Sequence, residues 1–296
     1  MPTQNSMTQR EAFWGEIVKS AYDDKSVVIL SADSGSPAFD KFRADRPNQF
    51  IHCGIAEANM ICVAAGLAMS GRKVFCFAIT PFITGRVFDQ IKVSIALMRL
   101  PVCLVAIGAG FSYDDAGPTH YGVEDMGIMK NLKGIEIISP YDAVSAKEAA
   151  LQALHSPAFR YVRLDRHVLP DITLPYQLDT SPAATILTSG AMGETSKKIA
   201  ESMNLSAVRM LTVFPFDPLV PLHGERLIVL EEHFYTGGLG ESVAAWMKDR
   251  GDERPLLRCA IPDHYEWENG GRAHLWKRAG LDVESLTEKI SKWLSQ

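Results

Sequence analysis

The chain has 296 residues, of which 47% are hydrophobic and 22% charged, and its formal net charge is -5. This composition is typical of a globular protein with a sizeable core, and the length allows about two ordinary domains. The 30 basic residues are scattered along the chain, so the sequence offers no basic patch of the kind that binds nucleic acids.

Strand and helix signals alternate along the first part of the chain. Apolar, β-rich runs predict strands at residues 27–31, 74–79, 102–107, 135–139 and 160–164. Helical patterns lie between them, at residues 9–23, 55–69, 82–98 and 143–154. Asp142 is the expected N-cap of the last of these helices. Continuous apolar strands separated by helices predict an α/β fold with a parallel sheet covered on both faces.

A stretch with three prolines separates this series from a second one. Residues 169–182 have little periodicity and are interpreted as a linker between a domain at 1–168 and a smaller α/β domain at 183–296. The second domain is not an internal repeat of the first. Its predicted strands are 184–188, 207–211, 226–230 and 256–260, and its predicted helices are 192–202, 239–250 and 283–294.

The cysteines and the apolar segments indicate the compartment. The five cysteines are odd in number and form no CxxC pair. Cys62, Cys76 and Cys103 lie in apolar runs, which predicts buried, reduced thiols. The first ten residues lack the apolar segment of a secretory signal. The longest apolar stretch, residues 55–69, is shorter than the roughly 18 residues that indicate a membrane span. We therefore expect a cytoplasmic protein without a membrane partner.

Residues 50–75, FIHCGIAEANMICVAAGLAMSGRKVF, carry the strongest chemical signal in the chain. Glu57 lies in the first turn of a helix that is almost entirely apolar, which predicts a helix buried on most sides. A carboxylate in such surroundings must be paired, neutralised or functional. The simplest alternative is a first-turn glutamate that only complements the helix dipole.

Two strings in this segment, GIAEANM and AAGLAMSGRKVF, resemble the transketolase family and its relative 1-deoxy-D-xylulose 5-phosphate synthase. In that family the glutamate of the motif hydrogen-bonds the aminopyrimidine ring of thiamine diphosphate and helps to generate the reactive ylid. The resemblance therefore implies thiamine diphosphate as the cofactor, with Glu57 as a catalytic and cofactor-binding residue. A desolvated carboxylic acid that shares a proton with a ring nitrogen suits this chemistry.

A second matching segment, ITPFITGRVFDQIK at residues 79–92, resembles the part of the family that supplies an aromatic side chain to the pyrimidine ring. Phe82 is the first choice for this stacking role and Phe88 the second. Core packing is the alternative for both, and for Phe88 it is the preferred interpretation. Arg86 in the same segment either binds substrate or pairs with Asp89, and the sequence does not separate these alternatives.

Three shorter segments match the family in the same order. GPTHYGVED resembles the substrate loop, in which His120 matches the histidine that contacts the oxygen atoms of the sugar. SADSGS places Asp33 near the entrance of the site. YVRLDR places Arg166 where the family has an arginine that binds the substrate phosphate, and Arg10 is a weaker candidate for the same anion. Surface pairing with carboxylates is the alternative for both arginines.

The resemblance covers only the pyrimidine-binding and C-terminal domains of the family, and a GDG string is absent from the chain. In full-length transketolases GDG and a later asparagine bind Mg²⁺ and the diphosphate. The resemblance therefore implies a separate N-terminal partner subunit that carries GDG and the asparagine, in a heterotetramer. The string LEEHFYTGGLGE resembles a turn of the C-terminal domain and is interpreted as structural. Glu231, Glu232 and His233 lack metal-ligand spacing, so no metal site is predicted in this chain.

Two departures from the family affect the substrate. Ala116 stands where transketolases have an aspartate before GPTH, and Ala58 replaces the histidine of the EHNM string. Asp114 and Asp115 lie just upstream as alternatives for the missing acceptor. Loss of a hydrogen-bond acceptor from a site built for a substrate hydroxyl changes which sugars the enzyme selects. The sequence therefore does not identify the donor and acceptor sugars.

These patterns predict the C-terminal subunit of a split transketolase that transfers a two-carbon ketol unit from a ketose or ketose phosphate to an aldose. A first alternative is the beta subunit of a 2-oxoacid dehydrogenase or a related decarboxylating synthase. These enzymes share the fold and the glutamate, but the GPTH loop and Arg166 favour a sugar. A second alternative is a non-catalytic scaffold subunit, which would tolerate replacement of Glu57.

Overall fold

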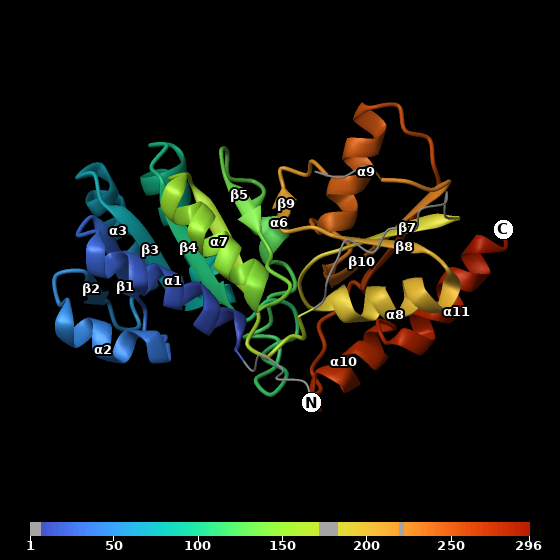
Figure 1. Ribbon diagram of the computed structural model, residues 1–296, viewed down its shortest axis with the longest axis horizontal. Helices are drawn as coiled ribbons and strands as arrows, with labels where there is room; N and C mark the ends of the chain where they lie inside the picture. The colour runs from blue at the N-terminus through green and yellow to red at the C-terminus, as the bar shows by residue number, and fades with distance from the viewer. Residues whose placement is uncertain (1–6, 172–182, 219–221) are drawn as a thin grey trace.

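The computed structural model describes residues 7–171, 183–218 and 222–296 of the chain. Two sheets organise it, one with the strand order β2-β1-β3-β4-β6-β5-β9 and one with the order β11-β10-β7-β8. Figure 1 shows the two units side by side, the first coloured mainly blue to green and the second yellow to red. Within the described residues, no helix has the length and apolar character needed to cross a membrane.

The seven-stranded sheet is parallel except at one edge, where β9 runs antiparallel to β5. Its inner strands β1, β4 and β6 are buried along their whole length, as a sheet covered on both faces requires, and β1 and β4 are almost entirely apolar. The predicted parallel α/β fold is confirmed. The edge strands β2 and β9 were not predicted, because each has only three residues, which is too short to show a strand pattern. The strands are β1 (Val27–Ser31), β2 (Phe50–His52), β3 (Lys73–Ile79), β4 (Val102–Ile107), β5 (Glu136–Ile138), β6 (Arg160–Leu164) and β9 (Thr212–Phe214).

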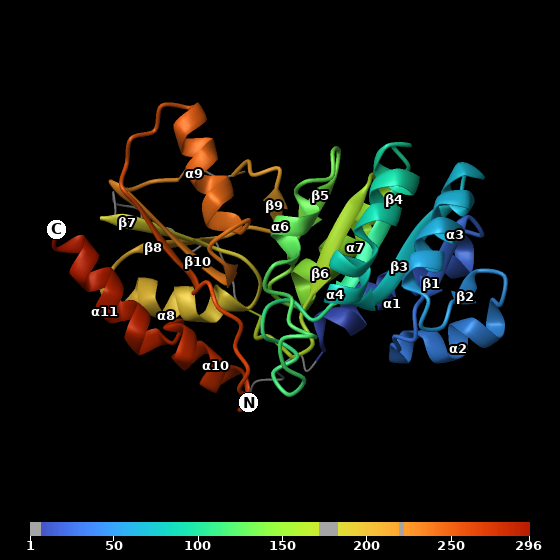
Figure 2. The ribbon, with the colours of Figure 1, turned by 180° about the vertical axis from the view of Figure 1, so that it is seen from behind.

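Helices cover both faces of this sheet, as Figures 1 and 2 show from opposite sides. One face packs against α1 (Gln9–Asp23), α2 (Pro37–Asp45) and α7 (Ala143–His155). The other packs against α3 (Glu57–Met69) and α6 (Asp125–Met129). The predicted cap of α7 is confirmed, because the Asp142 carboxylate accepts a hydrogen bond from the backbone N–H of Ser145 at 2.7 Å.

The prediction of one continuous helix at 82–98 is wrong. The chain instead forms α4 (Thr80–Ile83), a 3-10 turn (Gly85–Val87), α5 (Phe88–Ile91) and a π-helical turn (Lys92–Ala96). Thr84 interrupts the helix, because its φ and ψ of -116° and -94° lie outside the helical region. Its hydroxyl donates to the Thr80 carbonyl at 2.7 Å, a local bond that competes with helical pairing.

The prediction that the Glu57 helix is buried on most sides is also wrong. Helix α3 packs on the sheet through one face, and the opposite face is solvent-exposed in this chain at Ala58, Cys62, Gly66 and Met69. Cys62 is therefore an exposed thiol, contrary to the sequence-based expectation, whereas Cys76 and Cys103 are buried. All five cysteines are free. The uncovered face is apolar, and the Met69 side chain at its end is 64% exposed.

The second unit is a parallel four-stranded sheet with helices around it. The strand pairs β7–β8, β7–β10 and β10–β11 are all parallel. Helix α10 escapes the sequence patterns because it has only eight residues and half of them are polar or charged. The predicted linker 169–182 lies outside the described residues from position 172 onward. The elements are β7 (Ala184–Thr188), β8 (Ser206–Arg209), β10 (Arg226–Phe234), β11 (Leu256–Ile261), α8 (Gly193–Met203), α9 (Leu239–Asp249), α10 (Arg272–Ala279) and α11 (Val283–Leu294).

The two units share one hydrophobic core. A single buried cluster contains Ile137 of β5 together with Val213 of β9 and Val243 of α9. Backbones also meet directly at the junction, because a Cβ atom on Gly237 would lie 2.3 Å from the Cα atom of Gly127 in α6. Gly237 has a φ of +77°, a conformation that favours glycine. The glycines of the GGLG string therefore allow close packing between the units.

Glu231, at this junction, is a fully buried carboxylate on β10. It accepts hydrogen bonds from the backbone N–H groups of Leu239 and Gly240, the latter at 2.9 Å, and so caps α9. Burial raises the pKa of Glu231 to about 7. Across the junction, burial lowers the pKa of Lys130 to about 8, and its ammonium group donates to Ser242 Oγ at 2.6 Å. These contacts support the structural interpretation of the turn.

We expect the stability of the chain relative to Glu231→Gln to fall as pH rises. A carboxyl whose pKa is raised from 4.5 to about 7 in the folded chain stabilises it fully only below about pH 4.5. That contribution is lost as pH rises through about 7, whereas glutamine is neutral throughout. Urea denaturation of both proteins at pH 5 and pH 8 measures the change. A stability difference independent of pH would contradict it.

Candidate active site

The candidate residues gather at one edge of the seven-stranded sheet. The parallel strands β1, β3, β4 and β6 end at this edge, and the order of connections reverses between β1 and β3. Open α/β sheets bind ligands in the crevice at such a point. The residues that follow these strand ends, or begin the helix after β2, are Asp33, Glu57, Phe82, Arg86, His120 and Arg166.

Glu57 is the first residue of α3, and its side chain is only 6% exposed. The N-terminal end of a helix is a favourable place for a carboxylate. Its partner is Arg86, whose Nη1 donates to Oε1 of Glu57 at 3.1 Å. The Arg86 side chain is 45% exposed. The sequence left substrate binding or pairing with Asp89 open for Arg86, and in the structure its ion-pair partner is Glu57 instead.

Phe82 lies between Arg86 and His120. The guanidinium carbon of Arg86 is 3.8 Å from the centroid of the Phe82 ring, so a planar cation rests on its face. The His120 ring approaches the same phenyl ring edge-on, with 5.3 Å between centroids. Phe88 packs against the hydrophobic core, in line with its preferred interpretation. The structure thus brings Glu57, Phe82 and His120 together from three separate segments.

The loop that carries His120 is closed at its base by two backbone hydrogen bonds. Gly110 N donates to Gly122 O at 2.8 Å, and Gly122 N donates to Gly110 O at 2.9 Å. Within the loop, Nδ1 of His120 lies 2.9 Å from the hydroxyl oxygen of Thr119. With Nδ1 engaged in this way, the imidazole presents Nε2 as its second polar atom.

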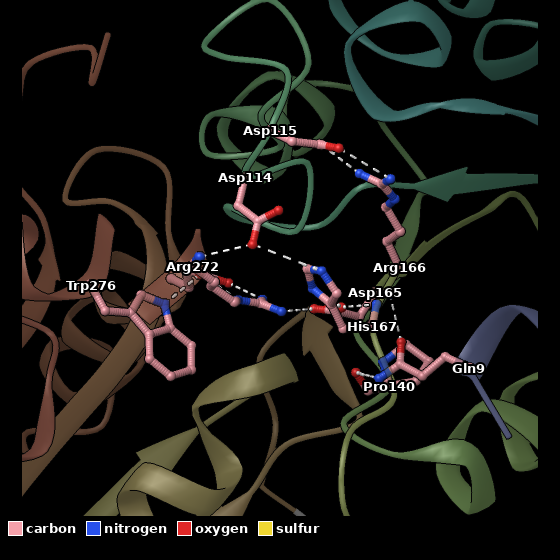
Figure 3. Close-up of polar contacts among 10 residues, drawn as sticks. Gln9, Asp114, Asp115, Pro140, Asp165, Arg166, His167, Arg272 and Trp276 are labelled. Carbon is pink, nitrogen blue, oxygen red and sulfur yellow. Dashed lines mark hydrogen bonds and ion pairs between the residues drawn. The ribbon is translucent and has the colours of Figure 1, made fainter. Parts of the chain in front are cut away.

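Arg166 stands beyond His120, separated from it by Tyr113. Its Nη1 donates to Oδ1 of Asp115 at 2.6 Å, a pair visible in Figure 3. The Arg166 guanidinium holds the pKa of Asp115 below its usual range. The Arg166 guanidinium carbon also lies 4.8 Å from the Tyr113 ring centroid, and the Tyr113 and His120 centroids are 5.8 Å apart. Ring contacts therefore connect Arg166 to His120.

Arg10 and Asp33 occupy the outer part of this edge. Arg10 Nη1 donates to the carbonyl of Gly35 at 3.4 Å, and Nε of Arg10 is buried without a hydrogen-bond partner among the described residues. Asp33 is exposed, has a φ of +55°, and lies 3.9 Å from Nε2 of His52. Within the described part of the chain, no hydrogen bond or ion pair joins Asp33 to Glu57. Its position is the C-terminal end of β1.

Sequence reasoning missed the network that supports the His120 loop from the second unit. Figure 3 shows Arg272, at the start of α10, between Asp114 of the loop and Asp165 at the end of β6. Its backbone N donates to Asp114 Oδ2 at 2.8 Å, and its Nη1 lies 2.7 Å from Asp165 Oδ2. Its Nε donates to Oε1 of Glu232 at 2.9 Å. The only signal in the sequence is an arginine after two glycines, which is not specific.

A second buried network lies beneath the loop. Asp125 Oδ2 accepts hydrogen bonds from Tyr161 Oη at 2.6 Å and from Arg163 Nε at 2.8 Å. Arg163 Nη2 also donates to the carbonyl of Gly122, at the base of the His120 loop, at 3.0 Å. His233 is fully buried beside Asp125, and burial lowers its pKa to about 4. The histidine of the EEH string is therefore part of the core.

Neither of the two alanines that depart from the family pattern is enclosed by the chain. Ala116 and Ala58 are both exposed. The neighbouring carboxylates are already engaged, since Asp115 pairs with Arg166 and Asp114 accepts from the Arg272 backbone. A carboxylate has about four acceptor positions, so these contacts still leave acceptor capacity for a substrate hydroxyl.

The side chains present fit a planar nitrogen heterocycle better than a metal ion. The planar guanidinium of Arg86 forms a hydrogen bond with the shielded carboxylate of Glu57 and stacks on the face of the Phe82 ring. Among the described residues, no group of three or more histidine, cysteine, aspartate or glutamate side chains has the arrangement of a metal site. The donor set thus matches the pyrimidine end of a coenzyme.

Two protein-family models match the chain. "Transketolase, pyrimidine binding domain" matches residues 5–171, and "Transketolase, C-terminal domain" matches residues 177–286. The chain is 29% identical to one of the apulose-4-phosphate transketolase subunits of Phocaeicola vulgatus, over 99% of both proteins. It is 30% identical to a putative transketolase C-terminal section of Methanocaldococcus jannaschii, over 95% of this chain and 94% of that one.

The chain also resembles longer enzymes in sequence and several solved structures in fold. A 1-deoxy-D-xylulose-5-phosphate synthase of Methylacidiphilum infernorum is 28% identical over 99% of this chain, which spans 49% of that enzyme. A structure described as a split gene transketolase, inactive beta4 tetramer, has a TM-score of 0.82 at 24% identity, over 98% of this chain and 99% of that one. Leishmania mexicana transketolase has a TM-score of 0.80 at 17% identity, over 100% of this chain and 47% of that one. At these identities the structures show the fold alone.

Proposed function

Because the chain belongs to the transketolase family, we propose that it is one subunit of a split, thiamine-diphosphate-dependent transketolase. The reaction is transfer of a two-carbon ketol unit from a ketose phosphate to an aldose. The observation that supports this function most is the grouping of Glu57, Phe82 and His120 at the carboxyl edge of the sheet. Two relatives that match along nearly their whole length are a transketolase subunit and a putative transketolase C-terminal section.

Each residue in this group has a defined task. Thiamine diphosphate, when bound, would supply an electron sink for the carbon–carbon bond cleavage of the ketose. Glu57 Oε1 would hold the proton that is shared with the pyrimidine ring, and the low exposure of its side chain would exclude competing water. Phe82 provides a face for that ring. Nε2 of His120 donates to, and accepts from, the reacting oxygen of the sugar. Asp33 borders the entrance to this group.

A separate N-terminal subunit holds Mg²⁺ and the diphosphate in this proposal. The chain lacks GDG, and hard oxygen ligands are needed for Mg²⁺. The uncovered apolar face of α3, which begins at Glu57, suits an interface between subunits, because exposed apolar patches mark interaction sites. We expect a heterotetramer of two copies of each subunit. The proposed domains are 1–168 and 183–296, joined by the linker 169–182.

Reconstitution with the N-terminal subunit tests the function. The two purified proteins are mixed with thiamine diphosphate and Mg²⁺ and supplied with a panel of ketose phosphates, including apulose 4-phosphate, each with an aldose acceptor. Formation of a ketose lengthened by two carbons is the expected result. Release of CO₂ from a 2-oxoacid, without transfer from any ketose, would favour a decarboxylating synthase instead. A relative of that class, the Methylacidiphilum infernorum synthase, matches this chain over only 49% of its own length.

Arg166 is proposed to bind the phosphate of the substrate, assisted by Arg10. Arg166→Ala should raise KM for a ketose phosphate about 10- to 100-fold, because charge-assisted hydrogen bonds are lost. KM for the unphosphorylated ketose should change little. Asp115→Asn is the matched control, since it removes the negative charge that pairs with Arg166 but keeps the guanidinium. If both variants change KM equally for the phosphorylated and the unphosphorylated ketose, Arg166 does not bind the phosphate and acts only through its ion pair with Asp115.

A further inference from the structure

Arg86 contacts both side chains that are assigned to the pyrimidine ring. It donates from Nη1 to Oε1 of Glu57 at 3.1 Å, and its guanidinium carbon lies 3.8 Å from the centroid of the Phe82 ring. At that distance the guanidinium is in van der Waals contact with the aromatic face. One planar, nitrogen-bearing group therefore satisfies the carboxylate and covers the phenyl ring at the same time.

An aminopyrimidine has the same relevant properties as this guanidinium. It is planar, it stacks through a π face, and its nitrogen atoms form hydrogen bonds with a carboxyl group. Both groups need the Glu57 carboxylate and the Phe82 face, and two groups in van der Waals contact with one face exclude each other. The pyrimidine ring can therefore reach these two side chains only if Arg86 leaves them.

The Arg86 side chain has solvent beside it, whereas the Glu57 side chain is enclosed. The Arg86 side chain is 45% exposed and begins on the short 3-10 turn Gly85–Val87, so a rotated side chain can enter solvent. Glu57 is 6% exposed and fixed on the first turn of α3. Without a cationic partner, a shielded carboxylate is costly. Arg86 thus compensates Glu57 in the absence of the coenzyme.

We propose that Arg86 is a positioning residue that occupies the pyrimidine position before the coenzyme binds and is displaced by it. This inference rests on the proposed function of Glu57 and Phe82. Binding must break the ion pair and the cation–π contact, so the apparent affinity for thiamine diphosphate is lower than the site would otherwise give. Removal of the guanidinium should therefore tighten coenzyme binding.

The test measures the Kd of thiamine diphosphate for the reconstituted two-subunit complex, by isothermal titration at saturating Mg²⁺. Arg86→Met, which keeps a long side chain but forms neither contact, should bind about three- to tenfold more tightly than wild type. Arg86→Lys keeps the charge but lacks the planar stack, so its Kd should fall between the two. Stopped-flow fluorescence should show faster association for Arg86→Met.

Arg46→Met is the matched control. Arg46 also lies over an aromatic ring, with its guanidinium carbon 5.0 Å from the Tyr22 centroid, but it is on the α1–α2 side of the sheet. Its replacement removes the same charge and should leave the Kd unchanged. If wild type binds and Arg86→Met binds equally or more weakly, the inference is refuted while the proposed function stands. If no variant or wild type binds thiamine diphosphate, the proposed function itself fails, and the inference with it.

Discussion

Glu57→Gln should lower kcat of the reconstituted enzyme by about 10²- to 10⁴-fold, the range expected when a positioned acid–base group is removed. Glutamine has nearly the same size but cannot share a titrating proton with the pyrimidine ring. In the structure the Glu57 carboxylate accepts a hydrogen bond from the Arg86 guanidinium, which lies over the Phe82 ring. Initial rates at saturating substrate and coenzyme, with assembly of the two subunits monitored by light scattering, provide the measurement.

Asp89→Asn is the control for this experiment. Asp89 is an exposed carboxylate on α5, close in sequence to Arg86 and outside the group of residues assigned to catalysis. Its replacement should leave kcat within about twofold of wild type, as expected for surface substitutions. An undiminished rate with Glu57→Gln in a correctly assembled complex would refute the enzymatic role and support a scaffold subunit.

Asp125→Ala should have the largest effect on stability, lowering the free energy of unfolding by about 3–5 kcal/mol. The Asp125 side chain is 1% exposed and that of its partner Arg163 is 4% exposed. Alanine would leave a buried guanidinium without its counter-charge and the hydroxyl of Tyr161 without its acceptor. Urea denaturation of the full chain, followed by circular dichroism, measures the loss.

Two variants separate the charge effect from the loss of hydrogen bonds. Tyr161→Phe removes one donor to Asp125 and leaves the ion pair, so it should cost only about 1 kcal/mol. Asp40→Ala removes an exposed carboxylate that lies 3.6 Å from Arg43 and should leave the urea midpoint close to wild type. A loss with Asp125→Ala no larger than that with Tyr161→Phe would show that the buried charge is not important.

Much of the fold follows from the sequence because most of its strands contain a continuous apolar run. Such runs have few alternatives to a central position in a covered parallel sheet. The missed elements fail this criterion. β9 has three residues, and its place beside β5 depends on pairing with a strand far away in the sequence. The break at Thr84 depends on a local hydrogen bond within an otherwise helical pattern.

The candidate site was predictable where a motif marks it and not where tertiary contacts build it. Glu57, Phe82 and His120 come from strings that resemble a family, and the structure brings these three together. The exposure of the uncovered face of α3 was not predictable. An apolar helix indicates burial, but its sequence does not say whether its own chain or another chain buries it. Arg272 was missed because its three carboxylate partners lie 40 or more residues away in the sequence.

The pairing of β9 with β5 limits how this polypeptide can be divided. A fragment ending at residue 171 would lack an edge strand and one wall of the shared core, although it contains every residue assigned to the coenzyme. The amide and carbonyl groups of β5 would then be available to strands of other molecules, which is a recognised route to aggregation. Minimal versions of this protein for screening or engineering should therefore retain both halves.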